Sequence, residues 1–279
     1  MDKLKTYLKH PLSFVLLILI GLASIITVAS IIFIIIYILV NGIPNLTTDL
    51  FSLHYNSKNQ SMLPSIFNTV FITFLTLLIA VPIGIFSAVY LVEYAKKGSK
   101  LVKVIRVTTE TLAGIPSIVF GLFGFLAFVI ALGWGYSMIA GVLTLVMMVL
   151  PTIIRTTEEA LLAVSNSYRE GSFGLGAGKI RTIFKIIVPT AIPGILSGVI
   201  LAIGRIVGET AALIYTSGTV AETATSLTDS ARTLSVHLYC LLSEGLFTNQ
   251  AYATAVILLL LVVGINALSN FIAKKLAKK

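Results

Sequence analysis

The sequence predicts an all-α integral membrane protein with six transmembrane helices. Of its 279 residues, 57% are hydrophobic and only 11% are charged, and the mean hydropathy is +1.02. Soluble domains carry roughly 25% charged residues, so this much apolar surface requires lipid as a second solvent. Six apolar stretches have the length of about 20 residues that a bilayer-spanning helix needs.

The first apolar stretch, Leu12–Val40, follows three lysines, so a cleaved signal peptide has to be considered. It far exceeds the roughly 7–15 apolar residues of a signal peptide and ends without a convincing cleavage sequence, which predicts a retained helix. The other five predicted spans are Leu63–Val92, Leu112–Leu132, Tyr136–Ile154, Thr190–Tyr215 and Tyr252–Ala273. Gly133-Trp134-Gly135-Tyr136 predicts a tight connection between the third and fourth spans, with aromatic residues at the membrane interface.

The basic residues predict the orientation of the chain, because lysine and arginine accumulate in cytoplasmic loops. Seventeen of the 20 lie on alternate sides of the spans. They are Lys3, Lys5, Lys9, Lys96, Lys97, Lys100, Lys103, Arg106, Arg155, Arg169, Lys179, Arg181, Lys185, Lys274, Lys275, Lys278 and Lys279. The opposite side has only Lys58 and Arg232, and Arg205 lies inside a span. We therefore expect both termini in the cytoplasm, in a multi-pass protein of the cytoplasmic membrane whose basic residues orient it in lipid and bind no nucleic acid.

Two outer segments are long enough to have a function of their own. They run from Asn41 to Met62 and from Thr216 to Gln250. In the second segment, apolar residues at Leu234, Leu238 and Leu241 predict a short helix. Both segments are either solvated connections or a docking surface for an external partner.

Several polar residues and prolines of the spans receive structural interpretations. Asn68, Thr69 and Thr73 are expected to form hydrogen bonds between helices, with a role in lining a path as the alternative. Glu158 and Glu159 are expected to pair with Arg155 or Arg169. Pro82, Pro116 and Pro151 are expected to bend their helices, because neighbouring helices can satisfy the freed carbonyl groups.

The inner loop between the fourth and fifth spans carries glycines among basic and apolar residues. Gly171, Gly174 and Gly178 lie in a short helical segment, and small residues let another surface approach closely. Pro189 then stands at the first turn of the next span, where proline is tolerated. This pattern predicts a helix along the membrane surface that a cytosolic partner presses on, or else an ordinary amphipathic surface helix.

The same loop resembles the EAA signature of ABC importer permeases, which reads E-A-A, three residues, G, nine residues, I, one residue, L-P. The matching residues are Glu170, Gly171, Ser172, Gly176, Ile186, Val188 and Pro189. Gly171-Ser172 replaces two alanines and Val188 replaces a leucine, which preserves size or character. In that family the loop, here about residues 165–189, is the coupling helix that sits in a groove of the ATPase subunit. The resemblance therefore implies that six of them, Glu170, Gly171, Ser172, Gly176, Ile186 and Pro189, couple the chain to an ATPase.

Four further stretches resemble the permeases of phosphate importers, and specifically their PstA-type subunit. They are Leu91–Ala95, Ala113–Gly124, Leu150–Leu162 and Gly204–Thr210, and the sequence Thr233–Tyr239 resembles the last outer loop of the PstA type. The resemblance implies the type I ABC importer permease fold. It divides the chain into residues 1–62, with an N-terminal tail, the first helix and an outer loop, and residues 63–273, the permease domain.

An arginine and a glutamate stand four residues apart inside the predicted fifth span, in Gly204-Arg-Ile-Val-Gly-Glu-Thr210. On a continuous helix, Arg205 and Glu209 lie about 40° apart around the axis and share one face. Gly204 and Gly208 form an adjacent strip that lets a neighbouring helix approach. An arginine within a bilayer costs about 2.5–3.5 kcal/mol, so Arg205 is expected to face a water-filled path or a partner.

The hypothesis for this pair is that Arg205 and Glu209 bind phosphate during translocation. A guanidinium group presents forked donors that match phosphate oxygens, and Glu209 would accept the hydrogen of a protonated phosphate while orienting Arg205. Sulfate has no such hydrogen at neutral pH and would be repelled by the carboxylate. The alternative is an internal salt bridge that only holds the helix together.

The sequence lacks the motifs of an enzyme. No G-x-x-x-x-G-K-[ST] sequence for ATP occurs, and no nucleophile–base arrangement is apparent, so the chain is expected to be no enzyme and to carry no cofactor. Cys240 is the single cysteine, and His10, His54 and His237 lie far apart, so no metal site is expected.

The resemblance implies four kinds of partner besides lipid: a second homologous permease subunit, two copies of a cytosolic ATPase, and an external phosphate-binding protein. A second copy of this chain in place of the homologous permease remains an alternative. Two other functions also remain open. One is a permease for sulfate, molybdate or phosphonate. The other is a secondary transporter or channel that acts alone, although inverted repeats with broken helices are not evident.

Overall fold

The structure is a computed structural model that describes residues 11–96 and 98–277, and this part of the chain contains helices and no β-strand. The basic residues Lys3, Lys5, Lys9, Lys97, Lys278 and Lys279 lie outside the described residues. The all-α class is confirmed. The longer helices are α2 (Pro11–Gly42), α3 (Leu63–Val89), α4 (Lys100–Ala113), α6 (Met138–Leu162), α9 (Val188–Val207), α11 (Leu234–Glu244) and α12 (Thr248–Ala277).

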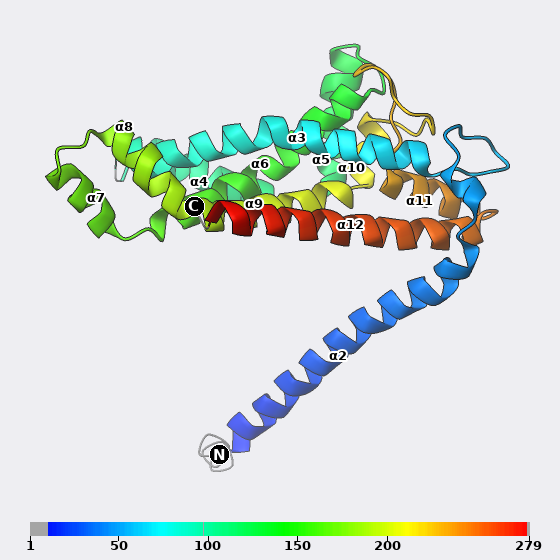
Figure 1. Ribbon diagram of the computed structural model, residues 1–279, viewed down its shortest axis with the longest axis horizontal. Coiled ribbons are helices and arrows are strands. Elements are labelled where there is room, and N and C mark those ends of the chain that lie inside the picture. Colours follow the sequence, from blue (N-terminus) through cyan, green and yellow to red (C-terminus); the bar gives the residue numbers. More distant parts are fainter. Residues whose placement is uncertain (1–10, 97, 278–279) are drawn as a thin grey trace.

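Shorter helices lie at the two ends of the bundle. They are η1 (Ile43–Asn45), η2 (Thr48–Phe51), α5 (Ser117–Gly124), α7 (Asn166–Gly174), α8 (Lys179–Thr182) and α10 (Ala211–Thr216). Three π-helical segments extend α3, α5 and α8, namely η3 (Tyr90–Tyr94), η4 (Phe125–Ala131) and η5 (Ile183–Ile187). In Figure 1, α7 and α8 occupy one end of the bundle and α10 and α11 the other. We call the first the basic end and the second the loop end.

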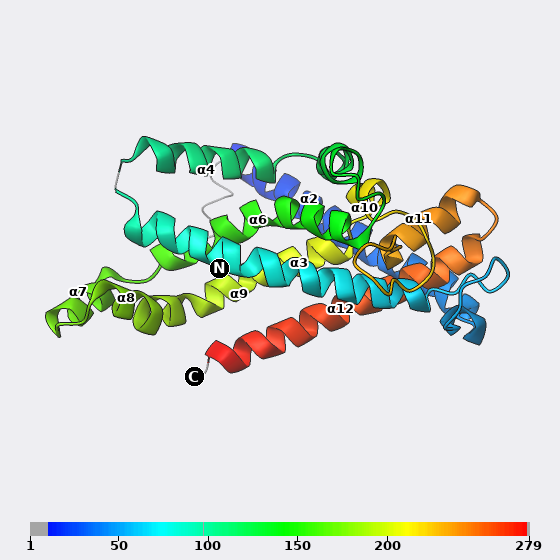
Figure 2. The ribbon, with the colours of Figure 1, turned by 90° about the horizontal axis from the view of Figure 1, so that it is seen from above.

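Helix α6 is the centre of the bundle. It packs against α3, α4, α5 and α9, and α12 covers α9 from the other side. Figure 2 shows α3, α6, α9 and α12 running lengthwise through the molecule. Residues such as Leu145, Met148 and Ile153 of α6 are fully buried, because a helix that is apolar on all sides in its middle needs neighbours all round.

Glycines let the helices of this bundle come into close contact. A side chain at Gly84 of α3 would collide with Ile153 of α6, and one at Gly194 of α9 would stand 2.6 Å from the Cβ atom of Ala160. Small residues at such positions allow backbones to approach closely in a membrane. Helices α3, α6 and α9 therefore form one tightly packed unit.

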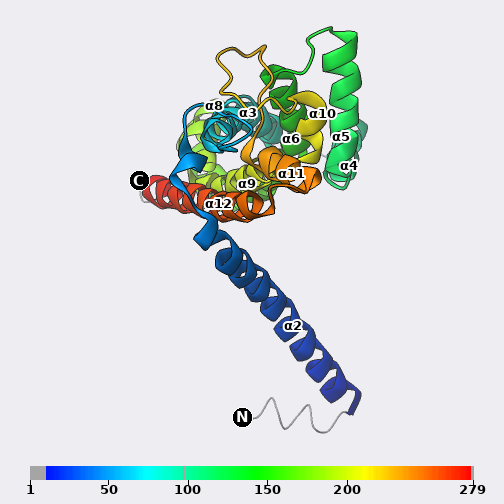
Figure 3. The ribbon, with the colours of Figure 1, turned by 90° about the vertical axis from the view of Figure 1, so that its right-hand side faces the viewer.

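Helix α2 leaves this unit at an angle. Figures 1 and 3 show it projecting from the loop end, with most of its length beside no other part of the described chain. Its side chains are almost all exposed, although the helix is apolar throughout. It is held where Gly42 meets Tyr252 and Val256 of α12, and where the hydroxyl groups of Tyr37 and Tyr252 lie 3.2 Å apart.

Five of the six predicted spans contain a long apolar helix, and the predicted third span is instead a bent pair of shorter helices. The predicted span Leu112–Leu132 begins inside α4, which ends at Ala113, and α5 starts a new helix at Ser117 after a bend of 103°. Pro116 explains the break, because proline disfavours helical geometry at the residue before it. The described residues therefore form five long apolar helices, or six spans if α4 with α5–η4 is one broken span. By contrast, α3 and α6 continue through Pro82 and Pro151.

The fifth predicted span, Thr190–Tyr215, is also divided. Helix α9 ends at Val207, and α10 begins at Ala211. The prediction that Arg205 and Glu209 share the face of one continuous helix is therefore wrong. The predicted short helix in the outer segment is confirmed as α11.

Candidate functional site

The exposed face of α9 follows a groove beside α6. Gly194, Ser197, Leu201, Gly204 and Gly208 recur on this face, at the spacing of successive helical turns. Two adjoining cavities of about 390 and 350 Å³ lie between this face and α6. Their walls combine small and polar side chains with apolar ones such as Tyr168 and Leu201.

The groove leads toward a break in the chain at Gly208, Glu209 and Thr210. The amide groups of Gly208 and Glu209 still donate to Gly204 and Ile206, which closes the last turn of α9. The side chain of Glu209 then accepts a hydrogen bond from the amide of Ala212 at 3.0 Å, and so caps the first turn of α10. The last turn of α9 therefore closes at Gly208, and the side-chain acceptor of Glu209 begins α10, which divides the span.

Arg205 stands at the last turn of α9, next to this break. Its side chain is partly buried, and in the described part of the chain it has no hydrogen-bond acceptor and no carboxylate oxygen within 4.0 Å. The internal salt bridge to Glu209 is therefore absent from this conformation. The guanidinium group keeps its five N–H donors for a group outside the described chain.

The glycines beside Arg205 are open. A side chain added at Gly204 meets nothing within 4 Å, and one at Gly208 meets only the α9 backbone at 3.5 Å. The close approach of a neighbouring helix that the GxxxG spacing predicts is not made by the described residues of this chain. The open strip is instead available to a solute or to another subunit.

Helix α11 contacts Glu209 from the loop end, and the outer segment 216–233 is held by α3. The hydroxyl group of Ser235 donates to the backbone carbonyl of Glu209, and Glu209 is only 8% exposed. Asn68 of α3 donates to the carbonyls of Glu222 and Arg232 and accepts from the amide of Ala224. Asn68 thus holds the outer segment to α3, in a helix-to-loop contact where a bond between helices was predicted. Ser235 also contacts the site, and no spacing in the sequence revealed it.

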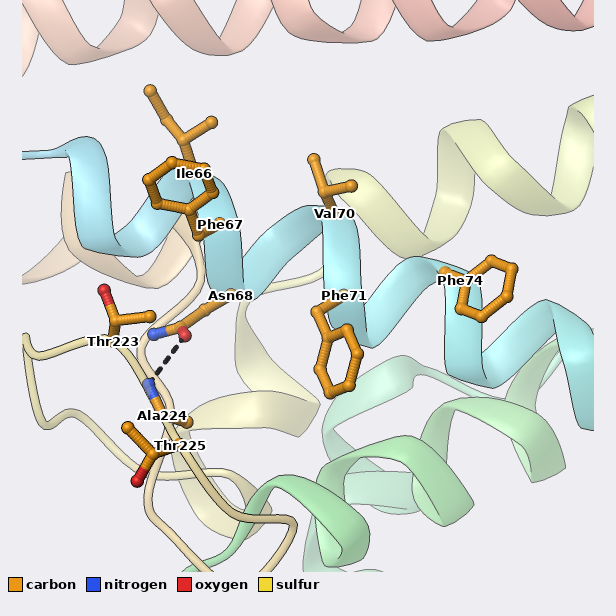
Figure 4. Close-up of a pocket in the computed structure, with 9 residues that line it drawn as sticks. All are labelled: Ile66, Phe67, Asn68, Val70, Phe71, Phe74, Thr223, Ala224 and Thr225. Atoms are coloured by element: carbon orange, nitrogen blue, oxygen red, sulfur yellow. Dashed lines mark hydrogen bonds between the residues drawn. The ribbon is translucent and has the colours of Figure 1, made fainter.

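A cavity larger than these two lies elsewhere. It measures about 630 Å³ and follows the outer face of α3 next to residues 223–225. Figure 4 shows that aromatic and aliphatic side chains line it, with Asn68 at its edge. Because no cationic side chain lines this cavity, it does not have the chemistry of an anion site.

Residues 165–189, the loop that resembles the EAA signature, form the basic end. Of the six residues that the EAA resemblance singles out, Glu170, Gly171 and Gly176 are exposed, and Gly176 has a φ of +79°, which favours glycine. Ser172 is buried and lies 2.8 Å from the hydroxyl of Thr182, so it joins α7 to α8. Ile186 packs against the core at this end, and Pro189 occupies the first turn of α9.

Ion pairs at the basic end differ from the expected ones in one respect. Glu159 pairs with Arg155 at 3.0 Å, as predicted. Glu158 instead pairs with Arg106, and Arg169 pairs with Glu93 at 2.7 Å. The expected pairing of Arg169 with Glu158 or Glu159 is wrong, because Arg169 turns toward the end of α3. Glu93 lies 76 positions away in the sequence, so no local spacing could reveal this pair.

Comparisons with known proteins define the class of this chain. The family model described as binding-protein-dependent transport system inner membrane component matches residues 80–279. A chain from the crystal structure of a bacterial alginate ABC transporter, in complex with alginate pentasaccharide-bound periplasmic protein, has a TM-score of 0.71 at 15% identity, with 98% of each chain covered. The chain therefore belongs to the family of binding-protein-dependent transport system inner membrane components, and it is an ABC importer permease with the type I fold.

Two relatives place it within this class. It is 32% identical over 277 residues to the probable ABC transporter permease protein YqgI of Bacillus subtilis (strain 168), with 93% of this chain and 94% of that protein covered. It is 38% identical over 199 residues to the phosphate transport system permease protein PstA of Yersinia pestis, with 71% and 67% covered. The resemblance to PstA-type permeases is thus confirmed, and family membership leaves a secondary transporter that acts alone without support.

Proposed function

We propose that this permease subunit moves inorganic phosphate across the cytoplasmic membrane as part of an ATP-driven importer, and that Arg205 binds the anion on the way. The observation that carries the proposal is the state of Arg205. This cation lies in an apolar helix of an importer permease, on an open face, without an internal acceptor among the described residues. Arginine in a membrane faces a partner or a water-filled path, and phosphate offers oxygens that match its forked donors.

Glu209 acts in this proposal as a separate acceptor and does not orient Arg205. One carboxylate oxygen is engaged by the amide of Ala212, and the carboxylate can still accept from the P–OH group of a protonated phosphate through its other oxygen. A fully ionised sulfate has no hydrogen to donate, and its charge would be repelled. The PstA relatives support phosphate as the cargo.

The exposed parts of the chain support the proposed partners. A second permease subunit would cover the open strip of α9 and the unpartnered α2. Two cytosolic ATPase copies would supply ATP hydrolysis, one of them pressing on the exposed coupling loop. An external phosphate-binding protein would dock at the loop end, so both termini would be cytoplasmic, in accordance with the basic residues.

The test is uptake of radiolabelled phosphate by cells that depend on this transporter. We expect Arg205→Gln to abolish uptake while the protein still accumulates in the membrane, because the amide lacks the positive charge. Lys58→Gln is the matched control, since it removes a cation from an exposed position in the outer loop and should retain uptake. Normal uptake by Arg205→Gln would refute the proposed anion contact.

Competition between anions tests the cargo and the role of Glu209. In the unchanged transporter, excess sulfate, molybdate or phosphonate should leave phosphate uptake intact, and stronger inhibition by one of these would identify it as the cargo. Glu209→Gln preserves an acceptor for the Ala212 amide but removes the negative charge. We expect sulfate to inhibit this variant, and continued rejection of sulfate would exclude Glu209 from selectivity.

A further inference from the structure

Arg169 is the most completely engaged cation in the described part of the chain. Its Nη2 and Nε atoms donate to the same oxygen of Glu93, at 2.7 and 3.0 Å. Both side chains are mostly buried, at 16% and 10% exposed. Charge-assisted hydrogen bonds of this kind are roughly twice as strong as neutral ones, and burial protects them from solvent screening.

The same guanidinium group reaches the end of α6. Its Nη2 atom donates to the carbonyl of Leu161 at 3.1 Å, and its Nη1 atom donates to the carbonyl of Val164 at 2.9 Å. These carbonyls belong to the last turn of α6 and the residues just after it, where helical partners are missing and a cation is favoured. Arg169 therefore joins three elements: its own helix α7, the end of α3 through Glu93, and the end of α6.

Other contacts make this region a single body. The Nζ atom of Lys179 lies 4.6 Å from the ring centre of Tyr94, the neighbour of Glu93. Ser172 and Thr182 join α7 to α8 through their hydroxyl groups. The exposed side of α7, with Glu170 and Gly171, contacts nothing in the described chain that would hold it to the bundle. Among the side-chain hydrogen bonds and ion pairs of the described residues, those of Arg169 are the ones that join α7 directly to Glu93 and to the end of α6.

We propose that Arg169 is a positioning residue for energy coupling: it clamps α7 to Glu93 of η3, the extension of α3, and to the last carbonyls of α6, so that a push on α7 moves both helices. This inference rests on the proposed function, in which a cytosolic ATPase presses on the coupling loop. Because every side-chain nitrogen of Arg169 already donates to the protein, this residue acts through the helices and not through the cargo.

The first experiment tests the clamp in the isolated chain, reconstituted in lipid nanodiscs and independent of any cargo. Hydrogen–deuterium exchange is measured for the amides of residues 166–174 in Arg169→Lys, Arg169→Gln and Glu93→Gln. We expect exchange in α7 to become at least about fivefold faster, while α12 is unchanged. The matched control is Arg181→Gln, an exposed arginine of the same loop, which should exchange as the unchanged protein does. Unaltered exchange in the Arg169 variants would overturn the proposal.

The second experiment measures coupling in the complete transporter in proteoliposomes, as cargo imported per ATP hydrolysed. We expect Arg169→Lys to lower this ratio about tenfold while ATP hydrolysis stays within about twofold, because lysine keeps the charge but loses the fork that reaches α3 and α6 together. A ratio that is unchanged, or hydrolysis and import that fall in proportion, would overturn the inference. If the unchanged complex imports an anion other than phosphate, the cargo assignment fails separately, and the same ratio is measured with that anion.

Discussion

Two arginines of this permease, Arg169 and Arg205, differ in the hydrogen-bond acceptors that the fold provides for them. At the basic end, Arg169 donates to a carboxylate and to two backbone carbonyls of other elements, and it is largely buried. At the α9–α10 break, Arg205 is partly buried and meets no acceptor in the described part of the chain. Hydropathy distinguishes Arg205 as the unusual residue, because Arg169 lies in a polar loop.

This difference in hydrogen-bond acceptors distinguishes an arginine that joins helices from one that can bind a ligand. A guanidinium group has five N–H donors in a fixed fork, and satisfying them within the chain leaves nothing to offer to a solute. Arg169 is therefore suited to joining helices, whereas Arg205 retains its donors in a place where an unsatisfied charge is costly. An arginine that the fold leaves without acceptors is a better candidate for an anion site than one that the fold has satisfied.

The largest expected effect is on stability after loss of each charge. Arg169→Met should destabilise the purified protein in detergent by about 3–5 kcal/mol, because Glu93 would remain buried without its counter-ion. Arg205→Met should be neutral or stabilising, since it removes a cation with no partner in the chain. Denaturant unfolding monitored by circular dichroism measures both. Equal losses for the two variants would contradict the comparison.

A third arginine, Arg232, is an intermediate case, and it lies beside a histidine that makes the stability of the protein depend on pH. Arg232 donates to the carbonyl of Thr219 and lies 3.2 Å from Nδ1 of the buried His237. Arginine has no acceptor, so this contact requires the neutral imidazole with its hydrogen on Nε2. Burial, assisted by the positive charge of Arg232, lowers the pKa of His237 to about 4.

The sign of the pH effect follows from the lowered pKa. The unfolded chain binds a proton near pH 6.5 and the folded chain does not, so stability is complete above about pH 6.5 and falls as the pH drops toward 4. The expected slope is about 1.4 kcal/mol per pH unit within this window. Unfolding as a function of pH should show the slope in the unchanged protein and lose it in His237→Gln. An identical slope in both would exclude His237 as its source.

The smallest expected effects on stability come from substitution of two glycines of α9, one at a packed position and one at an open position. A methyl group at Gly198 would collide with Thr156 of α6, whereas one at Gly204 meets nothing within 4 Å. We expect Gly198→Ala to cost about 1–3 kcal/mol through overpacking. Gly204→Ala should stabilise the isolated chain by up to about 1 kcal/mol, because alanine favours a helix. Thermal unfolding distinguishes them, and destabilisation by Gly204→Ala would show that this strip is already packed.

Much of the fold could be predicted from the residues alone. The apolar stretches that became α2, α3, α6 and α12 are set by the length of a bilayer-spanning helix and by the lack of charge, both of which are local properties. The coupling loop was recognisable because its signature has fixed spacings over a short stretch. The exposed position of Glu170, Gly171 and Gly176 agrees with an outward-facing loop.

The errors in the third and fifth predicted spans share one physical origin. Hydropathy reports which solvent a segment prefers, and Leu112–Leu132 and Thr190–Tyr215 both prefer lipid, but it does not report where a helix ends within that solvent. The third span breaks at Pro116. The fifth breaks where the side chain of Glu209 caps α10 and its carbonyl receives the hydroxyl of Ser235, a residue 26 positions away. A backbone carbonyl freed in an apolar region must find such a donor elsewhere.

By itself, the sequence determined that the chain crosses a membrane, which loop resembles the EAA signature, and which buried cation requires an explanation. Only the tertiary structure decided that Arg205 has no acceptor in the described chain, that Glu209 stands apart from it, and that Arg169 joins α7 to α3 and α6. The reason is that the preference of an apolar stretch for lipid depends only on the residues of that stretch. The hydrogen bonds of a charged group depend instead on which distant donors and acceptors the fold brings within about 3 Å.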